Sequence, residues 1–213
     1  MESRNSHILS LLSSSFLFRG LNSLQLQEIV QKTSYRTYPA GHILIEEDII
    51  SERVIYIIHG LVKVYKLMPD GKEIFLAIEK TGNYLGVMDL NNEPGSATIE
   101  TLQNTKVLIF YKRDLISILQ KNPFLWERMY RIILSKLNEL KQFHSIRLGN
   151  DLYQRTYLLL QFLSEFSNNH TVVLSQETIA SIVGATRPRV TEILHALKDA
   201  KKINISPKKI TVL

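Results

Sequence analysis

Residues 174–197 read LSQETIASIVGATRPRVTEILHAL, and this stretch carries the clearest fold signal in the chain. Ser175 can cap a first helix, and Gly184 supplies the left-handed turn that other residues resist. Thr186 can cap a second helix that has Pro188 in its first turn. The pattern predicts a helix-turn-helix. Its expected shared core is Ile179, Val183, Val190, Ile193 and Leu197.

The second helix of this motif presents a polar face that suits the major groove of DNA. Arginine can bond guanine O6 and N7 together, while cap hydroxyls and backbone N–H groups can hold phosphates. Residues 203–205 and 210–212 then predict a β-hairpin wing. The expected DNA contacts are Ser175, Thr186, Arg187, Pro188, Arg189, Thr191, Glu192, His195, Lys208 and Lys209. The alternative is a plain helical hairpin with solvated charges.

Length and composition agree with a globular chain of one large or two small domains. The 213 residues carry 26 Lys+Arg against 20 Asp+Glu, a net charge of +6 that permits a nucleic-acid partner. The chain contains no cysteine, which excludes disulfides, a cysteine nucleophile, thiolate zinc sites and cysteine-held iron–sulfur clusters. Because no apolar run is long enough to cross a bilayer, we expect a cytoplasmic protein without membrane contact.

Residues 35–110 alternate short β-rich runs with glycine turns, which predicts an antiparallel sandwich or barrel. The expected strands cover 43–45, 54–58, 61–66, 74–78, 97–101 and 106–111. Asp70-Gly71 gives the strongest hairpin signal. The first 35 residues instead predict short helices, with Asn22 or Ser23 capping one of them.

A long helix is expected to start near Pro123 and to end at Gly149-Asn150. One apolar stripe on it follows heptad spacing. Its members are Trp126, Tyr130, Ile133, Leu137, Leu140 and His144. A second stripe ends earlier and contains Leu125, Met129 and Ile132. We interpret the longer stripe as a dimer interface; the alternative is one wide core-facing stripe in a monomer.

In the order of these parts the sequence resembles the Crp/Fnr superfamily of bacterial transcription regulators. The resemblance also rests on Pro39-Ala40-Gly41, on YIIHGLVKV at 56–64, on Asp70-Gly71-Lys72-Glu73 and on GNYLG at 82–86. It implies an α+β fold. The implied segments are an N-terminal β-roll (a cyclic-nucleotide-binding-like jelly roll) over 1–113, a dimerisation helix over 114–149 and a winged helix-turn-helix over 150–213.

The resemblance implies a regulator and not an enzyme. It further implies double-stranded DNA, a second copy of the chain and RNA polymerase as partners, with a near-palindromic operator. Arg187 matches the superfamily's base-reading arginine, whereas Pro188 stands where glutamate is frequent and Glu192 where many members have a second arginine. The operator should therefore differ from that of the cyclic-AMP receptor.

The superfamily's cyclic-nucleotide contacts are missing. Cyclic-AMP-binding members use a Gly-Glu pair for the ribose and an arginine before Ser-Ala for the cyclic phosphate, but here Val87 follows Gly86 and Gly95 replaces that arginine. Losing a charge-assisted contact to a buried phosphate is severe, so we expect no cyclic AMP in the usual mode and no resident cofactor. The positions nearest the superfamily's effector pocket are Tyr84, Val87, Met88, Asp89, Ser96 and Thr98; their alternative role is packing.

The sequence leaves two alternatives. The β-roll would sense a small molecule other than cyclic AMP, or nothing. The helix-turn-helix could contact a protein instead of DNA. A metal-dependent dioxygenase of the cupin type would need a His-x-His pair, which the sequence lacks, and no metal ligands are expected.

Overall fold

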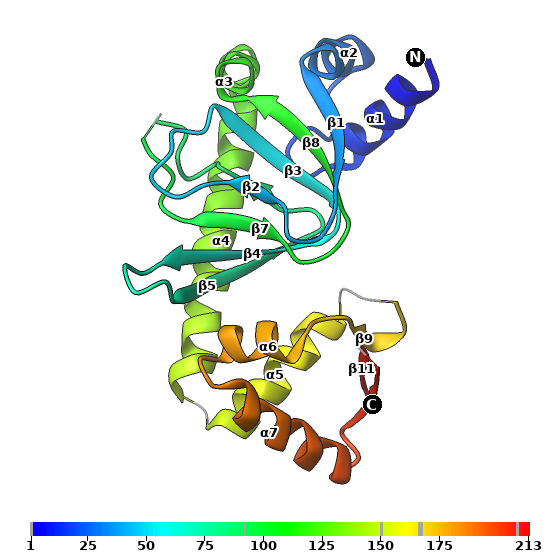
Figure 1. The fold of residues 1–213 in the computed structure, drawn as a ribbon. Helices are drawn as coiled ribbons and strands as arrows, with labels where there is room; N and C mark the ends of the chain where they lie inside the picture. Colours follow the sequence, from blue (N-terminus) through cyan, green and yellow to red (C-terminus); the bar gives the residue numbers. More distant parts are fainter. Residues whose placement is uncertain (1, 92, 150, 166–167, 208) are drawn as a thin grey trace. The chain divides into compact units, whose positions relative to one another are not determined.

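The computed structural model describes residues 2–91, 93–149, 151–165, 168–207 and 209–213, without the side chains of 2–4, 142–149 and 168. The chain divides into two compact units (Figure 1). The first unit contains Met1–Val64 and Ile78–Asn138, and the second contains Tyr65–Ala77 and Glu139–Leu213. The long helix contributes to both units, so they do not coincide with the three segments expected from the sequence, and those segment boundaries stay a prediction.

Eight strands build the N-terminal β-roll as two four-stranded sheets, with orders β1-β8-β3-β6 and β2-β7-β4-β5. The first sheet has β1 (Thr33–Tyr38), β3 (Arg53–His59), β6 (Tyr84–Leu85) and β8 (Thr105–Tyr111). The second has β2 (Ile43–Ile45), β4 (Leu61–Leu67), β5 (Glu73–Lys80) and β7 (Thr98–Thr101). The six strands expected from the sequence are therefore confirmed.

Strand β8 pairs antiparallel with both β1 and β3, and its neighbouring residues face opposite ways. Leu108 and Phe110 enter one hydrophobic cluster together with residues of the helices. Val107 and Ile109 enter another cluster, which includes residues of the second sheet. This sheet is therefore covered on both faces, which explains why its central strands read as nearly continuous apolar runs.

Among the described residues before position 150, four helices accompany the β-roll. They are α1 (Glu2–Ser14), α2 (Ser23–Gln31), α3 (Lys112–Lys121) and α4 (Phe124–Gly149). Helix α2 begins with a capping box, since the backbone N–H of Gln25 donates to Asn22 Oδ1 at 2.9 Å and the N–H of Asn22 donates to Gln25 Oε1 at 3.0 Å. Asn22 is thus the cap. Ile8, Leu12 and Ile29 pack into the first cluster.

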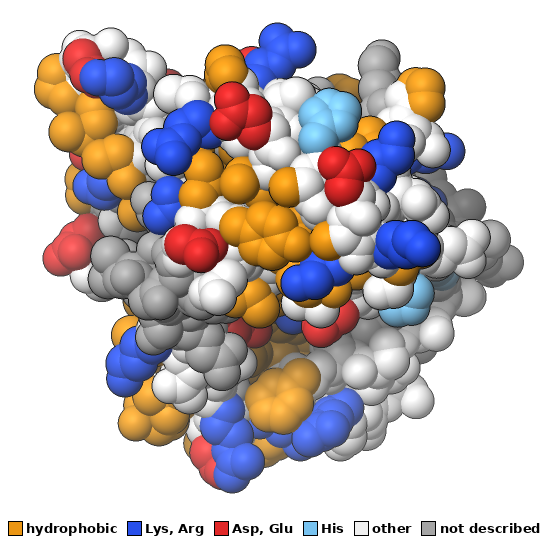
Figure 2. Space-filling view, turned by 90° about the horizontal axis from the view of Figure 1, so that it is seen from below, with side chains coloured by type: hydrophobic (Ala, Val, Ile, Leu, Met, Phe, Trp, Pro, Cys, Tyr) orange, Lys and Arg blue, Asp and Glu red, His pale blue; other side chains and the backbone are white. Residues whose placement is uncertain are grey.

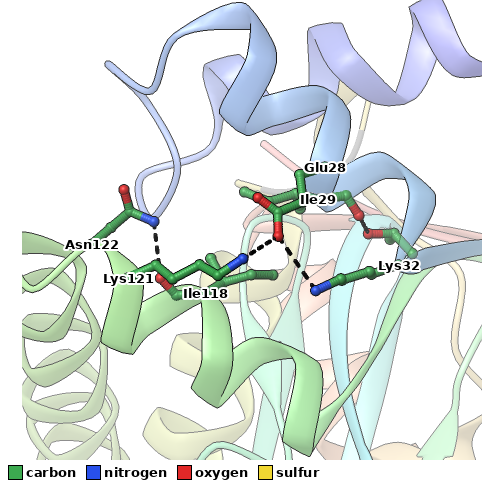
Figure 3. A network of polar contacts seen from close by, with 7 residues as sticks. Glu28, Ile29, Lys32, Ile118, Lys121 and Asn122 are labelled. Carbon is green, nitrogen blue, oxygen red and sulfur yellow. Dashed lines mark hydrogen bonds and ion pairs between the residues drawn. The ribbon is translucent and has the colours of Figure 1, made fainter.

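A polar network joins α2 to α3 (Figure 3). Glu28 accepts a hydrogen bond from Lys121 Nζ at 2.6 Å and lies 3.5 Å from Lys32 Nζ. The hydrogen bond from Lys121 and the nearby positive charges hold the pKa of Glu28 below its usual value. Beside this pair, Gln25 Nε2 donates to Asn122 Oδ1 at 2.7 Å. These contacts join α2 to the end of α3, directly before α4 begins.

Two strands of the β-roll were not expected from the sequence, whereas the expected hairpin is present. At the hairpin, the N–H of Gly71 donates to Met68 O and Asp70 Oδ1 accepts from the N–H of Lys72. Strand β1 has a polar sequence, so its place comes from pairing with β8 and not from an apolar run of its own. Strand β6 spans two residues only.

The second unit contains the helix-turn-helix and its wing. Its helices are α5 (Leu152–Ser164), α6 (Gln176–Val183) and α7 (Arg187–Asp199), with a short 3-10 turn η1 (Asn168–His170). Its sheet has the order β10-β11-β9, with β9 (Thr171–Val172), β10 (Ile203–Ser206) and β11 (Lys209–Val212). The hairpin of β10 and β11 confirms the predicted wing.

Candidate nucleic-acid interface

Helix α6 begins and ends as its sequence predicts. The Ser175 side chain accepts a hydrogen bond from the N–H of Thr178 at 3.0 Å and so caps the N-terminus. Gly184 closes the helix with φ 67° and ψ 49°, and the next N–H, from Ala185, donates to Ala180 O at 2.9 Å. Ala180 is buried, as the close approach of α6 and α7 requires.

Helix α7 is divided into an inner apolar face and an outer polar tip. Val190, Leu194 and Leu197 are completely buried, whereas Ile193, which was expected in the shared core, is only half-buried. Thr186 stands at the N-cap, although its side chain makes no cap hydrogen bond, and Pro188 lies in the first turn. Arg187, Pro188, Arg189, Glu192 and His195 are exposed. The first turn therefore offers two exposed guanidinium groups on a buried apolar base.

Two side-chain contacts join the first turn of α6 to α7, and no motif in the sequence predicts either. The Thr191 hydroxyl donates to Gln176 Oε1 at 2.7 Å and also lies 3.0 Å from the carbonyl oxygen of Arg187. Arg187 Nη1 lies 4.0 Å from Glu177 Oε2, and both side chains are largely exposed, so this pair contributes little stability. Thr191 is therefore partly committed to Gln176, whereas Arg187 stays available to a ligand.

A depression of about 360 Å³ lies between the start of α6, the start of α7 and the wing. Its polar lining includes the carboxylate of Glu177 beside Ser175, Gln176, Arg187, Ser206 and Lys209. Lys209 is exposed, and Lys208 lies outside the described residues. Figure 2, the view from below, shows Lys and Arg side chains spread among acidic and hydrophobic ones. Because the face drawn in Figure 2 does not single out one basic patch, the position of these residues on the motif is what makes them candidates.

Helix α4 separates the two apolar stripes that its sequence contains. Leu125 and Met129 are completely buried in the first cluster. In contrast, Trp126, Tyr130 and Leu137 keep 42%, 60% and 44% of their surface exposed. We call the longer stripe, from Trp126 to His144, the dimer seam. Its other members are less exposed or not described: Ile133 and Leu140 are half-buried, and the His144 side chain lies outside the described residues. The chain thus exposes large apolar side chains along one face of α4.

The six candidate effector positions do not gather on one surface. Tyr84 and Val87 belong to the first hydrophobic cluster, where the Tyr84 ring lies 4.7 Å from that of Tyr56. Thr98 is buried, and its hydroxyl accepts from the N–H of Glu47 at 3.1 Å. Met88 and Ser96 are exposed and Asp89 is half-buried. Burial raises the pKa of Tyr84 and of Asp89, although the positive charge of Lys112 partly lowers that of Asp89.

Gly95 lies where a longer side chain would meet the backbone. A Cβ at this position would be 2.9 Å from the carbonyl oxygen of Glu46 and 3.5 Å from that of Ile49. The two loops are also joined by hydrogen bonds, from the N–H of Gly95 to Ile49 O and from the N–H of Asp48 to Gly95 O. Val87 is buried in the core, so neither of these two positions presents a polar side chain.

The described residues contain neither a membrane-spanning helix nor a cluster of metal ligands. None of the described helices is long and apolar enough to cross a membrane. Among the same residues there is no group of three or more His, Cys, Asp or Glu side chains that could hold a metal ion.

Comparison with known proteins identifies the class. Residues 35–122 match the cyclic nucleotide-binding domain family, and residues 154–213 match the Crp-like helix-turn-helix domain family. The chain is similar to the cyclic AMP receptor protein of Thermus thermophilus, with 22% identity over 92% of this chain and 91% of the relative. It also resembles the CRP-like cAMP-activated global transcriptional regulator of Mycobacterium tuberculosis, with 24% identity over 86% of each chain.

The fold agrees with solved structures of such regulators. A CRP-family transcriptional regulator from Thermus thermophilus superimposes with a TM-score of 0.74 over 84% of this chain and 91% of that chain, at 20% identity. The chain is therefore a transcriptional regulator built from a β-roll and a helix-turn-helix DNA-binding domain. It belongs to the Crp/Fnr superfamily, as its sequence motifs implied.

Proposed function

We propose that the chain is a homodimeric regulator that reads a near-palindromic DNA operator with two copies of α7. The observation that carries the proposal is the exposed tip of α7, which presents Arg187 and Arg189, with Arg187 lining one depression together with Lys209 of the wing. Two such tips enter successive major grooves about 34 Å apart. A regulator of this kind acts in the cytoplasm and works with RNA polymerase.

Each contact has a chemical role in this proposal. Arg187 donates to guanine O6 and N7, and Glu192 accepts from cytosine N4. The cap positions Ser175 and Thr186 hold phosphates, as do the wing lysines. Arg189 and His195 contact a base or a phosphate, and Pro188 fixes the start of the helix. Thr191 acts by positioning, because its hydroxyl is already bonded to Gln176.

The second copy of the chain covers the exposed face of α4. Trp126, Tyr130 and Leu137 expose large apolar side chains there, with Ile133 and Leu140 beside them. Heptad spacing lets such residues pack against the same residues of a parallel partner helix. Dimerisation then explains why Trp126, Tyr130 and Leu137 stay exposed, although Ile133 of the same stripe packs against the first cluster.

The β-roll does not use cyclic AMP in the usual mode. Support comes from Gly95, which is packed against the 46–49 backbone where the phosphate-binding arginine would stand, and from Val87 in the core. The regulator senses a different small molecule or none. No cofactor takes part in DNA binding.

Gel-shift titrations test the proposal. An operator is first selected from random double-stranded DNA with the purified full-length chain, and its affinity is then measured at rising salt. We expect a steep loss of affinity with salt, because each neutralised phosphate releases a counterion. Failure to select any sequence, together with salt-independent binding, would show that the helix-turn-helix contacts a protein instead.

A further inference from the structure

A nearly buried ion pair joins α4 to the β-roll within the first unit. Lys136 Nζ donates to Glu79 Oε1 at 2.6 Å, and the two residues are 57 positions apart in the sequence. The side-chain amide of Asn83 donates to the other carboxylate oxygen of Glu79. Only 8% of Lys136 and 13% of the Glu79 side chain are exposed. Each oxygen of the Glu79 carboxylate thus accepts a hydrogen bond from a different segment, one from Lys136 of α4 and the other from Asn83 after β5.

Lys136 occupies the inner apolar stripe of α4. Leu125, Met129 and Ile132 precede it at spacings of one helical turn, and the first two are completely buried. A buried ammonium group is costly unless a hydrogen-bonded carboxylate faces it. An apolar stripe tolerates small rotations of a helix, whereas an ion pair with fixed geometry selects one rotation.

The rotation of α4 decides which residues stand on its outer face. Leu137, a seam residue, directly follows Lys136 and is exposed at 44%, and Leu134, which lies outside the seam, is exposed at 39%. Because successive residues of a helix are about 100° apart, seating Lys136 on the β-roll turns these leucines outward. The ion pair and the proposed dimer seam therefore depend on the same rotation of one helix.

We propose that Lys136 and Asn83 form a carboxylate-binding site whose occupant is the chain's own Glu79. This internal carboxylate holds α4 in the rotation that exposes the dimer seam, so the regulator binds its operator without an effector. The inference rests on the proposed function, because it takes the seam and the operator as given. It also selects the effector-free alternative among the two that the sequence left open.

Removal and replacement of the carboxylate test the proposal in the full-length chain. Glu79→Ala leaves Lys136 unpaired, so we expect the dimer dissociation constant from sedimentation to rise about tenfold and operator affinity to fall in parallel. Sodium acetate can place a free carboxylate in the emptied space, and it should restore both quantities. Sodium chloride at equal ionic strength should not. Wild-type values for Glu79→Ala in chloride alone would overturn the proposal.

Two further variants keep the test decisive if Glu79→Ala fails to fold. Glu79→Gln keeps the shape, removes the charge and leaves no room for acetate, so its weakened dimer should not be rescued. The exchange Glu79→Lys with Lys136→Glu should return the dimer to within about threefold of the wild type, because the Asn83 amide can turn to face either charge. An exchanged pair that stays as weak as Glu79→Gln contradicts the assignment.

The matched control is another ion pair of the same unit. Lys63 Nζ lies 3.3 Å from Glu100 Oε2 at comparable burial, and this pair joins strands β4 and β7. Glu100→Gln should leave dimerisation and operator affinity unchanged. If Glu100→Gln weakens the dimer as much as Glu79→Ala does, the effect of the Glu79 variant is general destabilisation and the proposal is wrong. If the wild-type chain forms a dimer but binds no DNA, the proposed function is wrong. The sedimentation results would then still test the role of Glu79 in dimerisation.

Discussion

The helix-turn-helix and the β-roll both keep the fold of their superfamily, but they differ in what their ligand-contact positions hold. In the helix-turn-helix, Ser175 caps α6, Gly184 makes the turn and Arg187 is exposed at the tip of α7. In the β-roll, Val87 is buried in the core and Gly95 is packed against a neighbouring loop. A fold is thus maintained by its core residues, whereas its ligand contacts change separately.

Among these predictions, replacing Arg187 with Ala should have the largest effect on operator binding. It tests the helix-turn-helix, whose contact positions keep polar side chains. The variant loses a bidentate contact to guanine in each half-site, worth ~1–3 kcal/mol of discrimination per contact. DNase footprinting on the selected operator should show no protection, while the melting temperature stays unchanged. The control is Arg36→Ala, which removes an exposed arginine of β1. An intact footprint from Arg187→Ala would refute the assigned role.

Charges on the seam should have the next largest effect. The double variant Leu137→Glu with Leu140→Glu forfeits about 1.5–3 kcal/mol of apolar burial per leucine and places carboxylates in the interface. Sedimentation velocity should therefore show monomers, and operator affinity should fall. Leu24→Glu changes an exposed leucine of α2 and should leave the dimer intact. If the double variant still sediments as a dimer, the seam lies elsewhere.

Placing an arginine at position 95, where cyclic-AMP-binding members have one, tests whether the β-roll can still bind cyclic AMP. In Gly95→Arg the new side chain meets the Glu46 carbonyl oxygen, so we expect a loss of about 1–3 kcal/mol of stability from overpacking. Calorimetry with cyclic AMP should show no tight binding to this variant or to the wild type. Ser96→Arg, at an exposed neighbouring position, should be close to neutral. Tight cyclic-AMP binding by the wild type would contradict the β-roll assignment.

The smallest expected effect concerns the α2–α3 contact. Lys121 and Lys32 lower the pKa of Glu28 in the folded chain, so the ionised carboxylate stabilises the fold above the pKa of the unfolded state. That contribution is lost as the pH falls through the folded-state pKa. Thermal unfolding should thus show Glu28→Gln slightly less stable than the wild type near neutral pH. The two should become equal in acid, and a difference that persists there would contradict the ion pair.

Elements with local signals were the most predictable from the sequence. Strand β2 has the bounds expected from its apolar run, and Asn22, Ser175 and Gly184 stand at the helix ends that their side chains or backbone favour. Strand β1 was missed because its polar sequence gives no periodic signal. The Thr191–Gln176 and Lys136–Glu79 contacts were missed for another reason, since neither partner marks the other along the chain.

The order of β-roll, long helix and winged helix-turn-helix follows from the amino-acid sequence alone, because hydrophobic period, turn residues and caps act over a few neighbouring positions. Three features instead depend on tertiary packing: Val87 faces the core, Gly95 meets the Glu46 backbone and Lys136 pairs with Glu79. Such contacts join segments far apart in the chain, so they exist only once packed sheets and helices bring those segments together.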